Sequence, residues 1–174
     1  MTLQDLSLIA QIAGVLLIPA SLFFVGLQMR QTHAVERANA QRDLLNQTRD
    51  WWMLTAEDET VFASFSAGLA DFATLGRYRQ AKFNALCWNL GHIVEGAFWQ
   101  HQAGLINASS HNGYIMAWLS IIGTPGGRQW WEETSQIVNI KVATYVNLRR
   151  DTHAGPLPLW TDLLPFFGQE PKKK

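Results

Sequence analysis

The stretch from Leu6 to Leu27 constrains this chain more than any other part of the sequence. It contains 22 residues and no charged side chain. As an α-helix rising about 1.5 Å per residue it would be about 33 Å long, enough to cross a bilayer core of about 30 Å. Pro19 is compatible with this, since membrane helices tolerate a proline. The sequence therefore predicts a membrane anchor over residues 1–29, surrounded by the lipid bilayer.

Two other structures were weighed for the same stretch. A cleaved signal peptide would carry basic residues before a shorter apolar run. The only charged side chain before this run is that of Asp5. A buried core helix would be unusually long and unusually free of charge. A membrane span is the better interpretation of the pattern.

The charges that flank the anchor predict its orientation. No Lys or Arg precedes it, and four arginines follow it within about twenty residues: Arg30, Arg37, Arg42 and Arg49. Cytoplasmic flanks carry the excess of basic residues. We therefore expect a single pass through a bacterial inner membrane, with a short N-terminus outside and the C-terminal domain in the cytoplasm.

The rest of the 174-residue chain predicts an all-α fold. Residues 30–54 lack Pro and Gly and are rich in helix formers, which favours a helical stalk that continues the anchor. Residues 55–150 predict a small helical bundle, with helix caps expected at Thr55, at Ser109 or Ser110, at Thr124 and at Asn139. A Pro-containing apolar tail, residues 151–174, completes the chain.

The predicted helix over residues 77–102 carries apolar groups on two sides. One stripe comprises Phe83, Cys87, Leu90, Val94, Ala97 and Phe98. On the opposite side, helical spacing brings together Trp88, His92, Glu95 and Trp99. Such a helix either lies at the centre of its bundle or presents one face to a partner. We therefore take the second set as a candidate ligand site or protein interface.

Further residues are candidates for contact with the membrane or a partner. Ala10 and Gly14 form a small-xxx-small patch in the anchor, where another helix could approach closely. In the tail, Trp160, Phe166 and Phe167 are too apolar for a solvated segment. They are expected to meet the membrane surface or a partner, or to fold back on the domain.

Composition and motifs give little support for catalysis. Lys plus Arg and Asp plus Glu number 14 each, so no net positive charge favours nucleic acid. No catalytic residue, metal ligand set or cofactor motif is predicted. Cys87 lies in an apolar run, typical of a core residue. His101 is expected to be a hydrogen-bonded core histidine, and His33, His111 and His153 lie in polar or loop sequence.

The segment from Pro125 to Arg128 allows two interpretations. The N–H groups at a helix start, with a nearby guanidinium, could hold an anion. A cap followed by a tight turn explains the same residues without a ligand, and the Lys and Ser/Thr of a phosphate loop are missing. The second interpretation is favoured. The neighbouring Trp130 and Trp131 are expected to divide between core and surface.

Three segments carry a family resemblance: Val25 to Thr32, Glu95 to His101 with Gly104 and Leu105 after it, and Pro125 to Glu133. Through them, residues 5 to 148 resemble a widespread family of uncharacterised bacterial proteins. The resemblance implies one N-terminal transmembrane helix and a cytoplasmic helical domain. It implies no activity, and the tail lies outside it.

Two functions follow as hypotheses. The favoured one is a membrane-anchored, non-enzymatic interaction protein, an accessory or scaffolding subunit that binds other membrane protein subunits or copies of itself. The alternative is a membrane-anchored enzyme or sensor that binds a small ligand or metal around His92, Glu95 and Trp99.

Overall fold

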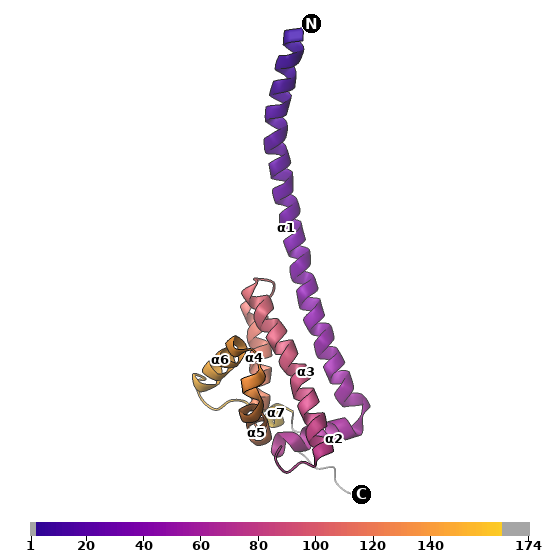
Figure 1. Cartoon of the computed structure of the whole chain (residues 1–174), viewed down its shortest axis with the longest axis vertical. Helices are drawn as coiled ribbons and strands as arrows, with labels where there is room; N and C mark the ends of the chain where they lie inside the picture. Colours follow the sequence, from indigo (N-terminus) through magenta and orange to yellow (C-terminus); the bar gives the residue numbers. More distant parts are fainter. Residues whose placement is uncertain (1–2, 165–174) are drawn as a thin grey trace. The chain divides into compact units, whose positions relative to one another are not determined.

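A computed structural model describes residues 3–164, without the side chains of residues 5, 6, 8–10, 12, 13 and 20. Throughout these residues the chain is helical and contains no β-strand (Figure 1). The prediction of an all-α fold is confirmed. The elements are α1 (Leu3–Glu57), α2 (Glu59–Ala70), α3 (Arg77–Gln102), α4 (Ala108–Ile122), α5 (Pro125–Thr134), the 3-10 helix η1 (Ser135–Ile137), α6 (Ile140–Asp151) and α7 (Trp160–Leu163).

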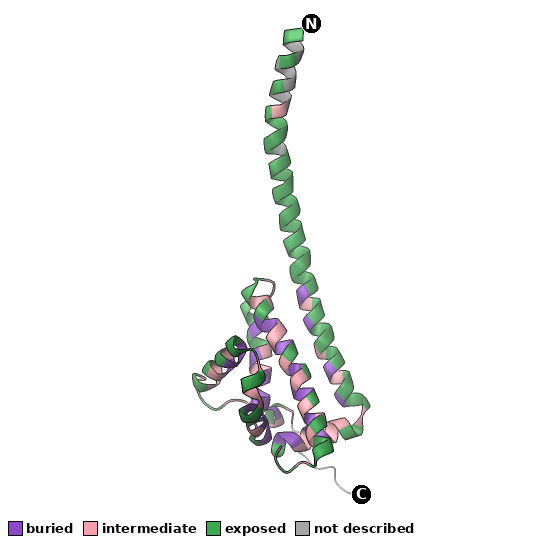
Figure 2. Ribbon diagram, viewed as in Figure 1, coloured by how far each residue is buried: buried purple, intermediate pink, exposed green. Residues whose placement is uncertain are grey.

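The chain divides into two compact units, Met1–Ala40 and Gln41–Lys174. The described part of the first unit is a single stretch of α1, whose side chains from residue 15 to 39 are exposed wherever they are described (Figure 2). The second unit is a helical bundle that comprises residues 41–57 of α1 and the remaining helices. Among the described residues, every buried hydrophobic side chain except that of Ala40 lies in this bundle.

Residues 41–57 of α1 bury one face within the bundle. Leu44, Trp51 and Thr55 are 0%, 1% and 3% exposed, and their spacing of seven and four residues places them on one side of the helix. The indole N–H of Trp51 donates to the carbonyl oxygen of Leu86 in α3 at 3.0 Å. The Trp51 ring also meets Phe65 of α2 edge to face, with centroids 5.4 Å apart. This face therefore joins α1 to the core of the bundle.

The first helix cap of the bundle lies three residues later than the sequence indicates. Thr55 is buried inside α1 and donates to the carbonyl oxygen of Trp52 at 2.8 Å, so the expected cap at Thr55 is wrong. The cap is Asp58, whose carboxylate accepts from the backbone N–H groups of Thr60 at 2.7 Å and Val61 at 3.3 Å. A carboxylate is a good cap, and the Thr55 side chain is buried inside the helix instead.

We expect the Asp58 cap to make the bundle sensitive to acid. The hydroxyl and backbone N–H of Thr60 lower the pKa of Asp58 from 3.8 to about 2. The cap therefore stabilises the fold above about pH 3.8, and this contribution is lost as the pH falls toward about 2. In a thermal melt followed by circular dichroism, the melting temperature should fall across this interval. Asp58→Ala should reduce that fall, and an unchanged pH profile in the variant would count against the cap.

Helix α3 is the central helix of the bundle. Helices α2 and α4 pack against it, and its buried stripe contains every apolar residue expected there, together with Leu86 and Ile93. The helix spans the predicted residues 77–102. After it, Gly104 has a φ of 72°, a left-handed conformation that favours glycine.

The glycines at the start of α5 allow two helices to approach closely. A Cβ at Gly126 would lie 1.8 Å from the carbonyl oxygen of Gly68 in α2, and one at Gly127 would lie 2.0 Å from that of Ile121. The Thr124 hydroxyl accepts from the N–H of Gly127 at 3.1 Å, which confirms the expected cap. These close contacts support a cap and packing role for the segment rather than an anion site.

The remaining caps and the tail are also described. Asn139 caps α6 as expected, whereas α4 is capped by Asn107 instead of a serine. The tail folds back as far as α7: Trp160 is 7% exposed and stacks on Trp52 with centroids 5.6 Å apart. Of the alternatives weighed for Trp160, this burial fits folding back on the domain and does not fit contact with the membrane or a partner. Phe166 and Phe167 lie outside the described residues.

Candidate functional site

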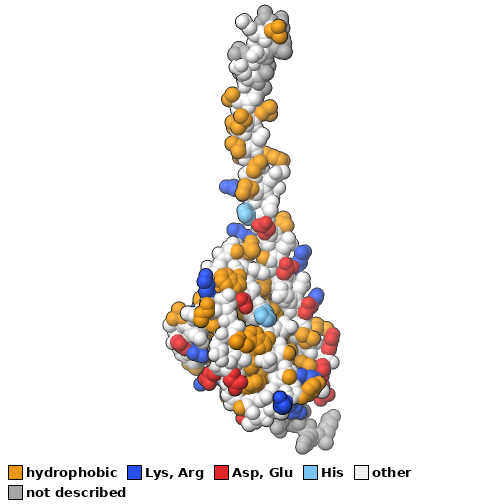
Figure 3. All heavy atoms as spheres, in the orientation of Figure 1, with side chains coloured by type: hydrophobic (Ala, Val, Ile, Leu, Met, Phe, Trp, Pro, Cys, Tyr) orange, Lys and Arg blue, Asp and Glu red, His pale blue; other side chains and the backbone are white. Residues whose placement is uncertain are grey.

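A shallow apolar cleft lies where α3, α4, α5 and α6 meet. Side chains from all four helices and from the end of η1 form its walls. The lining residues are Trp88, Gly91, His92, Val94, Glu95, Trp118, Trp130, Trp131, Val138 and Val142. Hydrophobic side chains also gather on the face of the bundle shown in Figure 3, with a histidine among them.

The floor of the cleft is a cluster of four tryptophans. The Trp130 ring meets Trp88 and Trp118 edge to face, with centroids 5.8 and 5.7 Å away, and Trp118 meets Trp131 at 5.8 Å. Edge-to-face packing is a favourable arrangement of aromatic rings. The indole N–H groups of Trp130 and Trp131 donate to Asn84 at 2.8 Å and Asn147 at 2.9 Å. These bonds fix the ring orientations, so the floor is preformed.

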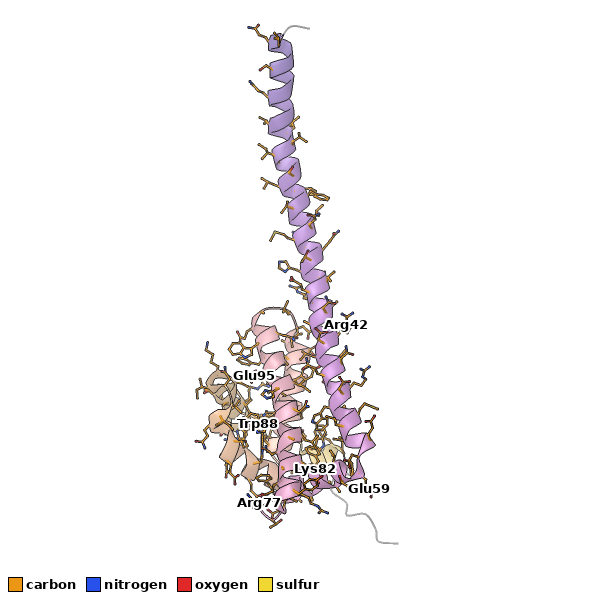
Figure 4. All side chains as sticks on the ribbon, turned by 45° about the vertical axis from the view of Figure 1, so that its right-hand side comes forward. Arg42, Glu59, Arg77, Lys82, Trp88 and Glu95 are labelled. Atoms are coloured by element: carbon orange, nitrogen blue, oxygen red, sulfur yellow. The ribbon has the colours of Figure 1, made fainter. Side chains whose placement is uncertain are left out.

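The rim of the cleft carries its polar groups. Trp88 and Glu95 lie seven residues, or about two turns, apart on the same side of α3 (Figure 4). The Glu95 carboxylate is 4.0 Å from Nδ1 of His92 and accepts from the indole N–H of Trp99 at 3.4 Å. Its side chain is 28% exposed and that of His92 is 69% exposed. A carboxylate and an imidazole are therefore available at the edge of an aromatic floor.

The size of the cleft limits what it can bind. The cavity volume of the cleft is about 10 Å³, so roughly one water molecule fits there. Pockets for small organic ligands usually enclose about 300 Å³ or more. The cleft is therefore too small to enclose a whole organic ligand.

The structure brings together three of the four residues that the sequence groups on this face. Trp88, His92 and Glu95 line the cleft, whereas Trp99 lies outside it and is 39% exposed, beside the ammonium group of Lys141 at 5.8 Å. The sequence missed the contributions of α4, α5 and α6. Trp130 and Trp131 are both buried, so the expected division between core and surface is wrong. The signal in the sequence that could have indicated the contribution of α5 was the pair of adjacent tryptophans after a helix cap.

Two kinds of reactive group were also inspected. Within the described part of the chain, no group of three or more His, Cys, Asp or Glu side chains is placed to hold a metal ion. Cys87 is 1% exposed, and burial raises the pKa of its thiol well above its usual range. A buried thiol of this kind is poorly reactive.

The second candidate surface is the apolar segment of α1, residues 14–29. Helix α1 is the one helix in residues 3–164 that is long and apolar enough to cross a membrane, and none of its most apolar segment is buried. Six side chains there expose 64–71% of their surface: Val15, Leu16, Leu17, Ile18, Leu22 and Phe23. A Cβ at Gly14 would meet nothing within 4 Å. The side chain of Ala10 lies outside the described residues.

The functional interpretation therefore depends on the cleft and on the apolar segment of α1. Both features are observed in this chain itself. The family resemblance of the sequence stays a prediction. Comparison of the chain with protein-family models, with curated proteins and with solved structures finds no match.

Proposed function

We propose that this chain is a non-enzymatic interaction protein anchored in a bacterial inner membrane by a single helix. In this role it is an accessory or scaffolding subunit that binds other membrane protein subunits or copies of itself. The observation that carries the proposal is the row of exposed apolar side chains on α1 between residues 15 and 29, wherever these are described.

This surface is unfavourable in water. Burying a Leu, Ile, Val or Phe side chain is worth about 1.5–3 kcal/mol relative to leaving it exposed. Residues 15–24 expose seven large apolar side chains, Phe24 included, so the bilayer is their natural environment. The helix has no break between the apolar segment and Glu57. Because residues 41–57 of this helix also form part of the core, the continuity supports a permanent anchor over a cleaved leader.

The orientation is part of the proposal. Arg30, Arg37, Arg42 and Arg49 all follow the apolar segment in α1, and no Lys or Arg precedes it. By the positive-inside rule, the bundle lies in the cytoplasm.

The cleft supports interaction over ligand binding. The cleft has room for about one water molecule. However, some of its lining residues have exposed apolar residues as close neighbours in the sequence. Ile137 and Ile140, which are 70% and 76% exposed, alternate with the lining residues Val138 and Val142. Exposed apolar residues beside an aromatic floor are typical of protein contacts.

We expect the full-length protein to remain in the membrane pellet after alkaline extraction. Leu17→Arg combined with Phe23→Arg should move most of it to the supernatant, because an arginine near the centre of a span, where residue 17 lies, costs about 2.5–3.5 kcal/mol and the second adds a smaller cost. Immunoblotting of both fractions measures the effect. A variant with Asn46→Arg and Gln47→Arg adds the same charge at exposed positions of the bundle and should stay in the pellet. Wild-type protein in the supernatant would contradict the anchor.

The orientation has a separate test. Cys87 is the chain's single cysteine and is buried, so Cys87→Ser with Gln47→Cys gives one exposed thiol in the bundle. A membrane-impermeant maleimide should label that thiol after the inner membrane is opened and leave it unlabelled in intact spheroplasts. Labelling of intact spheroplasts would place the bundle outside.

Purification in mild detergent as a monomer without a partner would contradict the subunit role.

A further inference from the structure

Two histidines from neighbouring helices stack face to face inside the bundle. The rings of His101 in α3 and His111 in α4 have centroids 4.4 Å apart and planes inclined by 12°. His101 is half-buried, with Nδ1 3.2 Å from the carbonyl oxygen of Ile106, which confirms the expected hydrogen bond. His111 is 5% exposed, so the expectation of a polar or loop setting for it is wrong. The buried Nε2 of His111 has no hydrogen-bond partner among the described residues.

The groups around His111 favour its neutral form. Burial, followed by the charges of His101 and Arg149, lowers the pKa of His111 below its ordinary value of 6.5. From α6, Tyr145 packs on the His111 ring with centroids 5.5 Å apart, and the guanidinium of Arg149 lies over Tyr145 at 6.0 Å. Arg149 also donates to Asn112, next to His111 in α4. Two basic groups act on His111 through their charge: His101 from α3 and Arg149 from α6. Both carry a positive charge when protonated.

We propose that the His101–His111 pair is a pH-sensitive latch, which holds α6 against α3 and α4 while His111 is neutral and loosens α6 when His111 gains a proton. Protonation places a positive charge in a buried position beside Arg149 and His101, where it is both desolvated and repelled. The latch is independent of the proposed membrane anchor.

Loosening of α6 would alter the cleft. Val142 of α6 forms part of its wall, and Asn147 of α6 accepts from the indole N–H of Trp131 in its floor. The surface that we assign to protein contacts thus depends on the same helix as the latch. Mild acid would change both together.

The direction of the pH effect follows from linkage. The pKa of His111 lies below its ordinary value of 6.5 where α6 is closed, and it rises toward that value where α6 opens, because opening removes Arg149 and lets water reach the ring. The closed form therefore loses stability as the pH falls below about 6.5, by at most about tenfold per pH unit in the opening equilibrium. The loss levels off below the pKa of the closed form.

Hydrogen exchange of the full chain in detergent micelles tests the latch between pH 7.5 and 5. After correction for intrinsic exchange rates, amides of α6 should open progressively more often as the pH falls below about 6.5, and amides in the centre of α3 should not. His111→Phe keeps an aromatic ring in the stack and removes the titrating group. We expect this variant to lose the pH dependence of α6.

Two charge variants separate a latch from a purely structural contact. Arg149→Gln and His101→Phe each remove a positive charge that opposes protonation of His111. Each should raise the pKa of His111 in the closed form, so the opening of α6 should rise less in total and level off at a higher pH, whereas lost packing alone would change the opening equally at every pH. His33→Gln, at an exposed position of the first unit, is the control and should leave the profile unchanged.

Two results would overturn the proposal. One is wild-type exchange in α6 that stays constant across this pH range. The other is a pH dependence that survives in His111→Phe. Should His111→Phe not fold, an unshifted profile in Arg149→Gln would lead to the same conclusion.

Discussion

Replacing Gly126 by alanine is expected to lower the free energy of unfolding of the helical bundle by about 3 kcal/mol. The added methyl group would lie 1.8 Å from the carbonyl oxygen of Gly68 and 2.7 Å from the backbone nitrogen of Phe72. Both obstacles are backbone atoms, so no side chain can rotate away and α2 and α5 must separate. Urea unfolding followed by far-ultraviolet circular dichroism, in the detergent used for purification, measures the loss.

Gly113→Ala is the matched control. Gly113 is exposed in α4, and a Cβ there would meet nothing within 4 Å. Alanine is favoured over glycine in a helix interior by about 1 kcal/mol, so this variant should be slightly more stable than the wild type. If Gly126→Ala unfolds at the same urea concentration as the wild type, α2 and α5 do not approach as closely as described.

Replacing Trp51 by alanine is expected to lower the free energy of unfolding by about 3–5 kcal/mol. The ring is 1% exposed and makes edge-to-face contacts with Phe65 of α2 and Trp160 of α7. Its removal leaves a large cavity where residues 41–57 of α1 enter the core. The same urea experiment measures the effect, and circular dichroism avoids reliance on tryptophan emission.

Two further variants separate the contributions at this position. Trp51→Phe keeps most of the apolar volume and loses the hydrogen bond to the Leu86 carbonyl oxygen, so it should cost about 1 kcal/mol. Trp99→Ala removes a tryptophan that is 39% exposed and should change stability by less than about 1 kcal/mol. Equal losses for Trp51→Ala and Trp99→Ala would contradict the central role of Trp51 in the core.

Patterns that act along one helix could be predicted from the sequence. The buried stripe of α3 follows from spacing alone, because residues three and four apart share a helix face. The caps Thr124 and Asn139 follow from a side chain that accepts from a backbone N–H a few residues later. Thr55 and the two serines in the first turn of α4, Ser109 and Ser110, met the same local rule, and the prediction of a cap there was wrong. In each case a neighbouring Asp or Asn provides the cap instead.

The candidate site shows where local rules stop. Trp88, His92 and Glu95 share a face of α3, so the sequence could group them. The residues that complete the cleft come from α4, α5 and α6. They lie far from the α3 residues in the sequence, so the helical repeat does not link them to this face. Trp118 and Val142 carry the same kind of apolar signal as any other core residue. The stacking of His101 on His111 is likewise a contact between two helices.

The sequence by itself determined the helical class of the chain and the one segment apolar enough to span a membrane, because composition and helical spacing are local properties. Only the tertiary structure decided that Trp160 belongs to the core, that Gly126 allows α2 and α5 to approach, and that His111 is buried. These facts depend on which helices pack together. Burial is a property of the neighbours of a residue in space, and the order of residues along the chain does not state it.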